Sequence, residues 1–588
     1  MKILTNHIGY ESLASKRAII LGTTSDEFTS FRVLEAETGG EVYAGIPLAA
    51  GGVARWKDWH FWTATFDPVR AEGHYCIECM TSYGAIRSFP FAIQANLLEQ
   101  NTLSNVLYYF KAQHCSGRLD EADHHVPFDG DGSGRTVDAH GGWYDATGDY
   151  GKHLSHLCFS TYFNPQQIPL VVWSLFESVE ALKNRGDSNF NEYLRRLLDE
   201  AMFGADYLTR IKIPDGSFYI RVSAHGPEKR PEDRRLARRM RGFEPGGMEK
   251  APTAEAQKVP ESEYQVSYRS GGGVSIAALA LASTFLTSGE FKSADYLKAA
   301  EDAFAYLEAH NLELTNDGQE NILDDYCALL AATQLYKATS NAAYQAAAAR
   351  RAESLMGRLA DSGPYMDYWR ADDTDRPFFH ASDAGFPVHS LLSYLDIASP
   401  AARPAVLETI KKSLTFALSL TAEVNNPFGV SRQLVQDKNG TRRSAFFFPH
   451  NTEVSPWWQG ENARLSGMAA AARRASAHFK GDQAFYDQLQ GFAWDQLNWI
   501  LGLNPFDLCM LHGSGRNNPP YIVYGDSYQF TNCPGGICNG ITGGVEDEED
   551  IAFHTPNSLP SITDNWRWGE QWLPHAAWYL LAVAVGDT

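Results

Sequence analysis

About a dozen amphipathic or alanine-rich stretches follow one another after residue 98, and they restrict the possible folds of this chain more than any other feature. They lie near residues 99–115, 168–185, 190–210, 272–288, 292–310, 324–339, 341–360, 386–398, 401–421, 461–477, 481–501 and 571–585. Their apolar residues recur with the 3.6-residue period of a helix, and no strand pattern of similar strength separates them. An even number of antiparallel helices in one large domain favours a ring of helix pairs, with the site in the loops of one face.

The first 95 residues have a different pattern. Residues that favour strands cluster or alternate at 17–21, 31–34, 62–66 and 74–79, and glycine and aspartate turns separate these runs. Short strands at such intervals are typical of a β-sandwich. Since 588 residues are too many for one ordinary domain, we expect two: a β-sandwich over residues 1–96 and a helical domain over residues 97–588, packed together with little linker.

The net charge of −21 argues against one class of partner, nucleic acid, which requires a basic surface. The basic run at residues 229–241 is interleaved with acids and reads better as a solvated insertion. An acidic chain suits a cationic substrate, although solubility alone also explains the charge. No stretch of eighteen apolar residues is present, so we expect no membrane span. The N-terminal residues lack an apolar signal region, which favours a cytoplasmic location.

A glycine-rich stretch at residues 141–153 carries two carboxylates four residues apart, Asp145 and Asp149. Glycine lets the backbone approach a ligand closely, and the rings of Trp143 and Tyr144 offer flat faces that suit a sugar. A carboxylate pair in this setting can position and deprotonate a water molecule. A turn with solvated acids is the alternative, but the density of glycine and aromatic residues favours a functional site.

A third carboxylate, Glu570, stands among tryptophans at the start of the last predicted helix. Burial against aromatic faces raises the pKa of a carboxyl group and makes it a usable general acid. An acid that only complements the dipole of the helix is an equally good interpretation of Glu570 taken alone.

Five short motifs are spread over nearly the whole chain. They read LTNHIGY at residues 4–10, YFKAQHC at 109–115, GGWYDATGDYGK at 141–152, DDYCA at 324–328 and WILGLNP at 499–505. The third resembles the G-G-W-[HY]-D-A-G-D-[HY]-G-K signature of glycoside hydrolase family 9. The others resemble, in the right order, the start of that family's immunoglobulin-like domain, its Y-F-x-x-Q-R-C opening, one of its helices and its Y-x-L-G-x-N-P segment.

This resemblance implies an (α/α)6 barrel preceded by an immunoglobulin-like β-sandwich, and inverting hydrolysis of a β-glycosidic bond. Asp149 falls on the family's general base, Asp145 on the partner that helps to hold the nucleophilic water, and Glu570 on the general acid. An inverting site keeps its acid and base about 6.5–9.5 Å apart, which leaves room for the water. The base must stay ionised while the pKa of the acid is raised.

Three departures from the family pattern bear on the substrate. One extra residue stands between Asp145 and Asp149, the H-H-R motif of the cellulases is absent, and Gly569 replaces the asparagine before the acid. The longer D-A-T-G-D resembles the branch of exo-β-D-glucosaminidases, which release glucosamine from the non-reducing end of short chitosan oligosaccharides, and closure of the cleft by the loop at 223–262 would enforce exo action. The alternatives are a β-1,4-glucanase or cellodextrinase acting on cello-oligosaccharides and, from another class, a non-catalytic carbohydrate-binding protein.

The remaining candidates for substrate contact are aromatic, amide or charged side chains near these motifs. They are Trp143, Tyr144, Trp457, Trp458, Glu461, Arg516, Asn517, Asp526, Trp566 and Trp568. Four of the tryptophans suit ring stacking, although core packing explains each of them at least as well: Trp457, Trp458, Trp566 and Trp568. Arg516 and Asn517 stand where the H-H-R motif would lie. Glu461 and Asp526 are the carboxylates that we consider as partners for a substrate ammonium group.

No cofactor is expected to be required. Some relatives hold zinc with two cysteines and two histidines after the Q-R-C opening, whereas this chain has Cys115, His124 and His125 and no second cysteine nearby. A tetrahedral structural site cannot close on that set, so we expect no zinc. A structural calcium ion on loop carbonyls and carboxylates is compatible with the sequence. These patterns carry no information on the oligomeric state.

Overall fold

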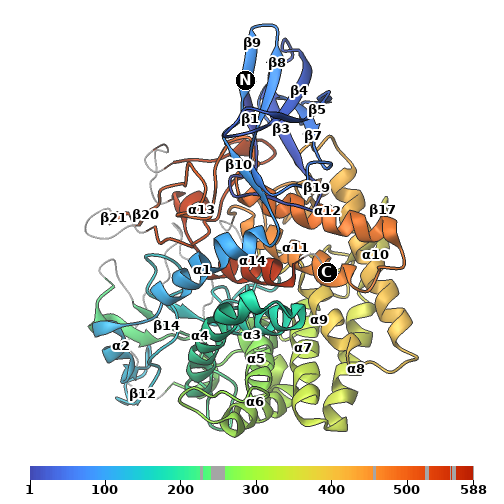
Figure 1. The fold of residues 1–588 in the computed structure, drawn as a ribbon. Helices are drawn as coiled ribbons and strands as arrows, with labels where there is room; N and C mark the ends of the chain where they lie inside the picture. Colours follow the sequence, from blue (N-terminus) through green and yellow to red (C-terminus); the bar gives the residue numbers. More distant parts are fainter. Residues whose placement is uncertain are drawn as a thin grey trace.

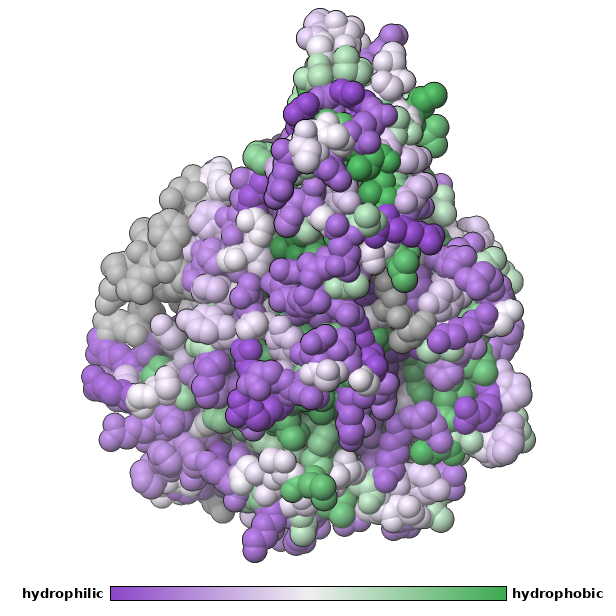
Figure 2. All heavy atoms as spheres, in the orientation of Figure 1, coloured by the Kyte–Doolittle hydropathy of each residue, from purple (hydrophilic) through white to green (hydrophobic). Residues whose placement is uncertain are grey.

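The computed structural model describes residues 1–224, 229–239, 259–453, 458–523, 529–530, 532–555, 558 and 564–586. A small β domain, which contains the N-terminus, stands on a much larger helical domain (Figure 1). The face of the molecule in Figure 2 is mostly hydrophilic, with apolar side chains scattered over both domains, as is normal for a protein surface.

The β domain is the sandwich that the strand pattern predicts. Its strands are β1 (Lys2–Leu4), β2 (Gly9–Glu11), β3 (Arg17–Gly22), β4 (Phe28–Glu35), β5 (Glu41–Gly45), β6 (Leu48–Gly51), β7 (His60–Thr65), β8 (Gly73–Thr81), β9 (Gly84–Arg87) and β10 (Phe91–Gln94). One sheet has the order β1-β3-β7-β6, and the other has the order β2-β10-β8-β4-β5, with β9 beside β8. Alternate residues of both sheets point inward, and Ile20, Phe31 and Ile77 are among those that form a core between them.

Six helices form the inner ring of the helical domain in the described part of the chain. They are α3 (Ile168–Arg185), α5 (Gly273–Ala282), α7 (Ile322–Thr339), α9 (Phe386–Leu395), α11 (Asn462–Ser476) and α14 (Leu573–Val585). Each helix contacts the next one in this order, and α14 contacts α3, so that the ring closes. Helices that are apolar on all sides must be buried, and the sequences GVSIAALALA of α5 and LPHAAWYLLAVAV of α14 are almost entirely buried here.

Six further helices, again among the residues described, form the outer ring of the helical domain. They are α1 (Leu97–Ala112), α4 (Asn191–Arg210), α6 (Ser293–Leu314), α8 (Ala342–Met356), α10 (Arg403–Ala422) and α12 (Gln483–Ile500). Each packs on one inner helix, for example α4 on α3, α8 on α7 and α12 on α11. The domain is therefore an (α/α)6 barrel, and each of its twelve helices coincides with one of the stretches predicted from periodicity.

The connections of the barrel differ in length between its two ends. Those from an inner helix to its outer partner are short, residues 283–292 being the longest. Those from an outer helix to the next inner helix are mostly long: 113–167, 211–272, 357–385, 423–461 and 501–572. Because all inner helices run in the same direction, the long connections gather at one end of the barrel. This end of the barrel carries residues 141–153 and Glu570.

The long connections contain short elements of their own. They are α2 (Gly117–Asp123), α13 (Trp566–Gly569), β11 (Val126–Pro127), β12 (Thr136–Val137), β13 (Lys152–His153), β14 (Arg221–Ala224), β15 (Arg234–Leu236), β16 (Leu359–Ser362), β17 (Tyr365–Trp369), β18 (Gln433–Gln436), β19 (Arg442–Ala445), β20 (Ile522–Val523), β21 (Gln529–Phe530), β22 (Thr542–Gly543) and β23 (Ile551–Ala552). Among the residues described, no helix is both long and apolar enough to span a bilayer.

Candidate active site

The loop with the two aspartates and the segment with Glu570 pair directly with each other. Ala146 and Trp572 form an antiparallel bridge. The amide of Thr147 donates to the carbonyl of Gln571 at 2.9 Å, and the amide of Leu573 donates to the carbonyl of Asp145 at 3.1 Å. These bonds join residues more than 400 positions apart in the sequence, and they place the three carboxylates in one site.

Glycines allow the aspartate loop to turn. The amide of Asp149 donates to the carbonyl of Ala146 at 3.0 Å and closes a turn. Gly148 within this turn has a φ of +86°, a backbone conformation that residues with a side chain rarely adopt. Gly142, with a φ of +74°, lies against the ring of Tyr207, which a Cβ atom at residue 142 would approach to 2.8 Å. The glycines of the signature are therefore required by backbone conformation and by close packing.

Asp145 is the buried member of the aspartate pair. Its Oδ1 accepts hydrogen bonds from the side-chain amide of Gln167 and from Trp572 Nε1, the latter at 3.2 Å. Its Oδ2 lies 3.2 Å from His156 Nδ1. Burial raises the pKa of Asp145, and the hydrogen bond and charge of His156 offset only part of that effect. Both oxygens are held in fixed positions, which suits a group that orients a water molecule.

Asp149 is more open, with 28% of its side chain exposed. Its Oδ1 accepts the amide of Gly151 at 3.0 Å and lies 3.9 Å from Lys229 Nζ. Burial by itself would raise the pKa of Asp149, but the charges of Lys229, His153 and His156 and the amide of Gly151 hold it below the usual range. Asp149 is therefore an ionised carboxylate that can accept a proton.

Glu570 has the opposite electrostatic setting. It directly follows the short helix α13, its side chain is partly accessible, and its backbone carbonyl accepts the amide of Asn539 at 2.8 Å. Burial raises the pKa of Glu570 well above the usual value, and the negative charges of Asp145 and Asp149 raise it further. A protonated carboxyl and an ionised carboxylate thus share one site, which is the combination that general acid and base catalysis requires.

Several residues of this site were not anticipated from the sequence. His153 and His156 stack with ring centroids 4.5 Å apart, and each has one nitrogen within 4.8 Å of an oxygen of Asp145 and of Asp149. Tyr521 is buried, and burial raises the pKa of its hydroxyl, an effect to which the charges of Glu570 and Asp149 add. The histidines follow the Gly-Lys of the signature, and that spacing was the only signal that could have found them.

Trp143 and Tyr144 lie within the packed interior rather than on an open surface. Trp143 is fully buried; its Nε1 donates to Glu200 at 2.8 Å, and its ring packs on Phe203. The Tyr144 hydroxyl accepts the amide of Ser116 at 3.3 Å. The core-packing interpretation describes both contacts, and these two rings support the aspartate loop from behind.

The tryptophans near Glu570 form an aromatic group. The ring of Trp458 lies tilted against that of His450, with centroids 4.1 Å apart, and it meets the edge of Trp568 at 5.5 Å. Trp568 is fully buried, and Trp566 is partly exposed beneath the guanidinium of Arg567, 4.5 Å from the ring centroid. Of these rings, Trp566 retains accessible surface that a ligand could use.

The charged and amide candidates have protein partners. Glu461 is buried in an ion pair with Arg464 at 2.6 Å and accepts the amide of Phe448 at 2.7 Å. Arg516 lies over the ring of Phe89 and binds Asp507 at 2.7 Å, at the boundary with the β domain. Asn517 donates to the carbonyl of Asp507 at 2.8 Å. These contacts show that all three side chains stabilise the surrounding structure. Two further candidates, Trp457 and Asp526, lie outside the described residues.

Cys115, the cysteine considered above for a zinc site, lies in a buried ion cluster. Asp123 pairs with Lys152 at 2.6 Å and accepts Arg234 Nε at 2.7 Å. The thiol of Cys115 lies 3.4 Å from the same carboxylate. Two cations therefore stand beside the cysteine, and they make this cluster unsuitable for a metal ion.

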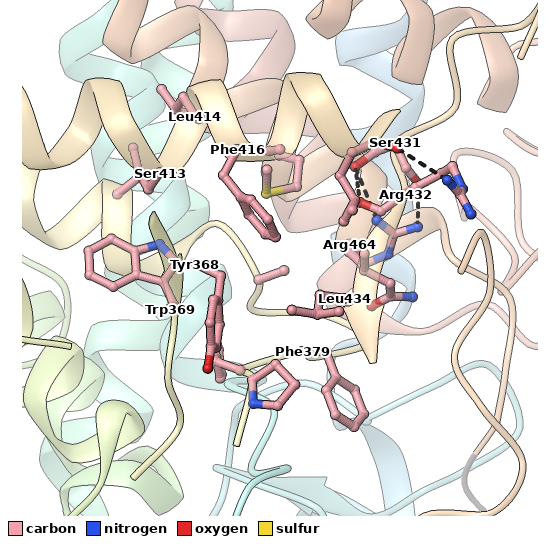
Figure 3. A pocket seen from close by; sticks show the side chains of 18 residues that line it. Tyr368, Trp369, Phe379, Ser413, Leu414, Phe416, Ser431, Arg432, Leu434 and Arg464 are labelled. Atoms are coloured by element: carbon pink, nitrogen blue, oxygen red, sulfur yellow. Dashed lines mark hydrogen bonds between the residues drawn. The ribbon is translucent and has the colours of Figure 1, made fainter. Parts of the chain in front are cut away.

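A cavity of about 80 Å³ lies between α9, α10, β17 and β18 (Figure 3). The rings of Tyr368, Trp369 and Phe416 form apolar walls, and Arg464 at one end donates to the carbonyl of Ser431 at 2.9 Å. The three carboxylates are not among its lining residues. It is smaller than the roughly 300 Å³ of common ligand pockets, and we interpret it as a packing defect of the barrel.

Two family comparisons cover most of the chain. The sequence model of glycosyl hydrolase family 9 matches residues 100–527, and that of the cellulase N-terminal ig-like domain matches residues 1–82. No match was found among curated protein sequences.

Solved structures with the same fold extend over both domains. A metagenome-derived glycoside hydrolase family 9 endoglucanase is 18% identical, with 99% of this chain and 98% of that chain covered and a TM-score of 0.63. A GH9 protein of Bacteroides ovatus is also 18% identical, with 99% of this chain and 98% of that chain covered and a TM-score of 0.65. The GH family 9 endoglucanase J30 is 18% identical, with 98% of this chain and 100% of that chain covered and a TM-score of 0.64. With an (α/α)6 barrel, three carboxyl groups brought together at the end of its long loops and a family match over most of its length, the chain belongs to glycosyl hydrolase family 9 and carries an N-terminal immunoglobulin-like domain.

Proposed function

We propose that the protein hydrolyses β-1,4-linked glucan oligosaccharides with inversion at the anomeric carbon. The observation that carries the proposal is the opposite setting of two carboxyl groups in one site: neighbouring charges lower the pKa of Asp149, whereas burial and the two aspartates raise the pKa of Glu570 well above its usual value. The pairing of residues 145–147 with 571–573 fixes their relative position. Glu570 gives its proton to the glycosidic oxygen, and Asp149 takes a proton from the attacking water.

Asp145 has the supporting part in this mechanism. Its carboxylate is fixed by Gln167, Trp572 and His156, so it can accept a hydrogen bond from the water without moving. An oriented water attacks more readily because the entropy of positioning it is already lost. The charge of Asp145 also helps to keep Glu570 protonated.

The charges around the base favour a neutral sugar ring. Lys229 lies 3.9 Å from Asp149, and Arg221 is close enough for the charges of both aspartates to act on its pKa. A substrate ammonium at this place would meet these cations. The structurally similar metagenome-derived protein and J30 are both named endoglucanases, which also supports a glucan substrate.

Release of glucosamine from chitosan oligosaccharides is the second candidate. The extra residue of D-A-T-G-D and the net charge of −21 favour it. However, the extra residue, Thr147, has a structural use: its hydroxyl donates to Gln571 Oε1 at 2.9 Å, and its amide donates to the Gln571 carbonyl. Glu461, the described candidate for binding an ammonium group, is already paired with Arg464.

A direct comparison of two substrates tests the proposal. The full chain is incubated with cellotetraose and, separately, with the glucosamine tetramer, and the products are separated over time. We expect cellotetraose to be cleaved at least tenfold faster, and the Glu570→Gln variant to cleave neither. Faster release of glucosamine would establish the second candidate, and cleavage of neither by the wild type would contradict both. A product series that begins with the monomer alone would indicate exo action.

A further inference from the structure

Two histidines and two carboxylates converge beside the catalytic centre. Asp145, Asp149, His153 and His156 each offer one ligand atom, and these four atoms lie within 4.8 Å of one another. His153 is 4% exposed, and its Nδ1 has no hydrogen-bond partner among the described residues. A buried imidazole with an unpaired nitrogen beside a carboxylate pair is unusual for a site that only activates water.

This donor set matches the preferences of zinc and related ions. Imidazole nitrogen and carboxylate oxygen bind Zn²⁺ at about 2.0–2.2 Å, so ligand atoms around a tetrahedral ion are about 3.3 Å apart. The four atoms lie within 4.8 Å of one another, so they would have to move closer together to bind a single ion.

The surroundings both help and oppose a cation. Oδ2 of Asp145 points toward His156, while Oδ1 is held by Gln167 and Trp572, so one oxygen remains oriented toward the cluster. Lys229 Nζ and the Arg221 guanidinium face the same carboxylates and repel a second cation. The Lys229 amine is joined to Asp149 only by a 3.9 Å contact on a flexible side chain, and it can swing away when an ion enters.

We propose that these four residues bind one divalent transition-metal ion, which occupies the place of the nucleophilic water and inhibits the enzyme reversibly. The inhibition, unlike the binding, rests on the proposed function. A bound ion would occupy the carboxylate of Asp145, which orients the water, and that of Asp149, which deprotonates it, so neither could act on a water molecule.

A surface cluster supplies the matched control. His124, Asp138 and His140 also have ligand atoms within 4.8 Å of one another, but these side chains are exposed or half-buried. Exposed side chains compete with water for the ion and lose more freedom when they bind it. We therefore expect the weaker affinity at this cluster.

Titration with Zn²⁺ alone, followed by calorimetry on the full-length protein, tests the proposal. The variants are His156→Gln, His153→Asn and, as the control, His124→Gln combined with His140→Gln. Cobalt(II) absorption in the visible region reports on the ligands, and thermal unfolding without metal shows that each variant is folded. Cleavage of cellotetraose is measured over the same Zn²⁺ range, with a chelator added at the end.

The expected result is one tight ion in the wild type, at least tenfold weaker binding in His156→Gln and His153→Asn, and unchanged tight binding in the control. Inhibition should follow the occupancy of that ion and disappear with the chelator. Wild-type affinity in both single-site variants, or loss of the tight ion in the control alone, would overturn the site. Tight binding in a protein that cleaves no glycan would support the site and contradict the proposed function.

Discussion

At the scale of single residues, neighbouring charges move the pKa values of the proposed base, Asp149, and the proposed acid, Glu570, in opposite directions. Asp149 and Glu570 are both surrounded by protein, and burial alone would raise both pKa values. Lys229, the histidines and the Gly151 amide reverse that effect for Asp149, whereas the two aspartates reinforce it for Glu570. The sequence allowed a prediction of the three carboxylates. It did not allow a prediction of Lys229, because that residue lies in an insertion that reads as a solvated charge run.

Replacing Asp149 by asparagine should lower kcat by about 10²–10⁴-fold, because the amide keeps the shape of the side chain but cannot accept the proton. Initial rates on cellotetraose and the midpoint of thermal unfolding are measured together. Asp295→Asn, at an exposed helix start, is the control and should keep both values. A variant at Asp149 that retained most of its rate would show that another group is the base.

Replacing Lys229 by methionine should move the acid limb of the pH profile of kcat/KM to higher pH. The lysine charge lowers the pKa of Asp149; without it the carboxylate is protonated at a higher pH, and activity is lost earlier on acidification. A shift of roughly one pH unit is expected for one nearby, partly solvated charge. The basic limb, which reports on Glu570, should move less. An unchanged acid limb would mean that Lys229 does not act on the base.

At the scale of elements, the site depends on how the long loops are tied together. The sheet β13-β14-β15 follows the aspartate loop, and Arg234 on β15 binds both Asp123 on α2 and the carbonyl of Tyr150. The aspartate loop itself pairs with residues 571–573. Sequence periodicity predicted the helices because each is a local pattern. It could not predict these ties, because the partners of Thr147 and Asp123 lie far away along the chain.

Replacing Asp123 by asparagine should lower the free energy of unfolding by about 3–5 kcal/mol, because Lys152 and Arg234 would remain buried with their carboxylate removed. Although burial opposes it, these two cations lower the pKa of Asp123 below its unfolded value. The stabilisation is therefore complete above about pH 4 and is lost as the pH falls through the folded pKa.

Urea unfolding of the Asp123→Asn variant and of the wild type at pH 7 and at pH 3.5 measures this effect. The difference between the two proteins should be smaller at the lower pH. Glu192→Gln, which removes an exposed ion pair with Arg195, is the control and should unfold as the wild type does. Equal stability of the Asp123 variant and the wild type at pH 7 would show that the cluster does not hold the loops.

At the scale of the whole molecule, the sandwich and the barrel share a core. Trp56, between β6 and β7, is fully buried, and its ring centroid lies 4.7 Å from that of Phe446 and 5.9 Å from that of Trp499. Ion pairs of Arg17 with Asp495 and of Lys57 with Asp550 surround this contact. The aromatic contact itself was not predicted, since a tryptophan in a turn between strands gives no sign of its partner.

Replacing Trp56 by alanine should destabilise both domains together, by about 3–5 kcal/mol, because a large buried ring is removed from their common core. Unfolding followed by tryptophan fluorescence and by far-ultraviolet circular dichroism should still give coincident transitions at a lower denaturant concentration. Tyr83→Ala, at a residue that is 81% exposed, is the control and should leave the transition in place. Loss of stability by the sandwich alone would contradict a shared core.

The stereochemistry of the first product tests the central claim most directly. Hydrolysis of cellotetraose, or of the glucosamine tetramer if that is the better substrate, is followed by proton NMR from the first minute. Action of Asp149 on a water molecule opposite the departing sugar predicts that the new anomeric centre appears first as the α form and then mutarotates to the β form. A first product in the β form would show that a carboxylate attacks the sugar directly, and it would contradict the assignment of Asp149 and Glu570 as base and acid of an inverting reaction.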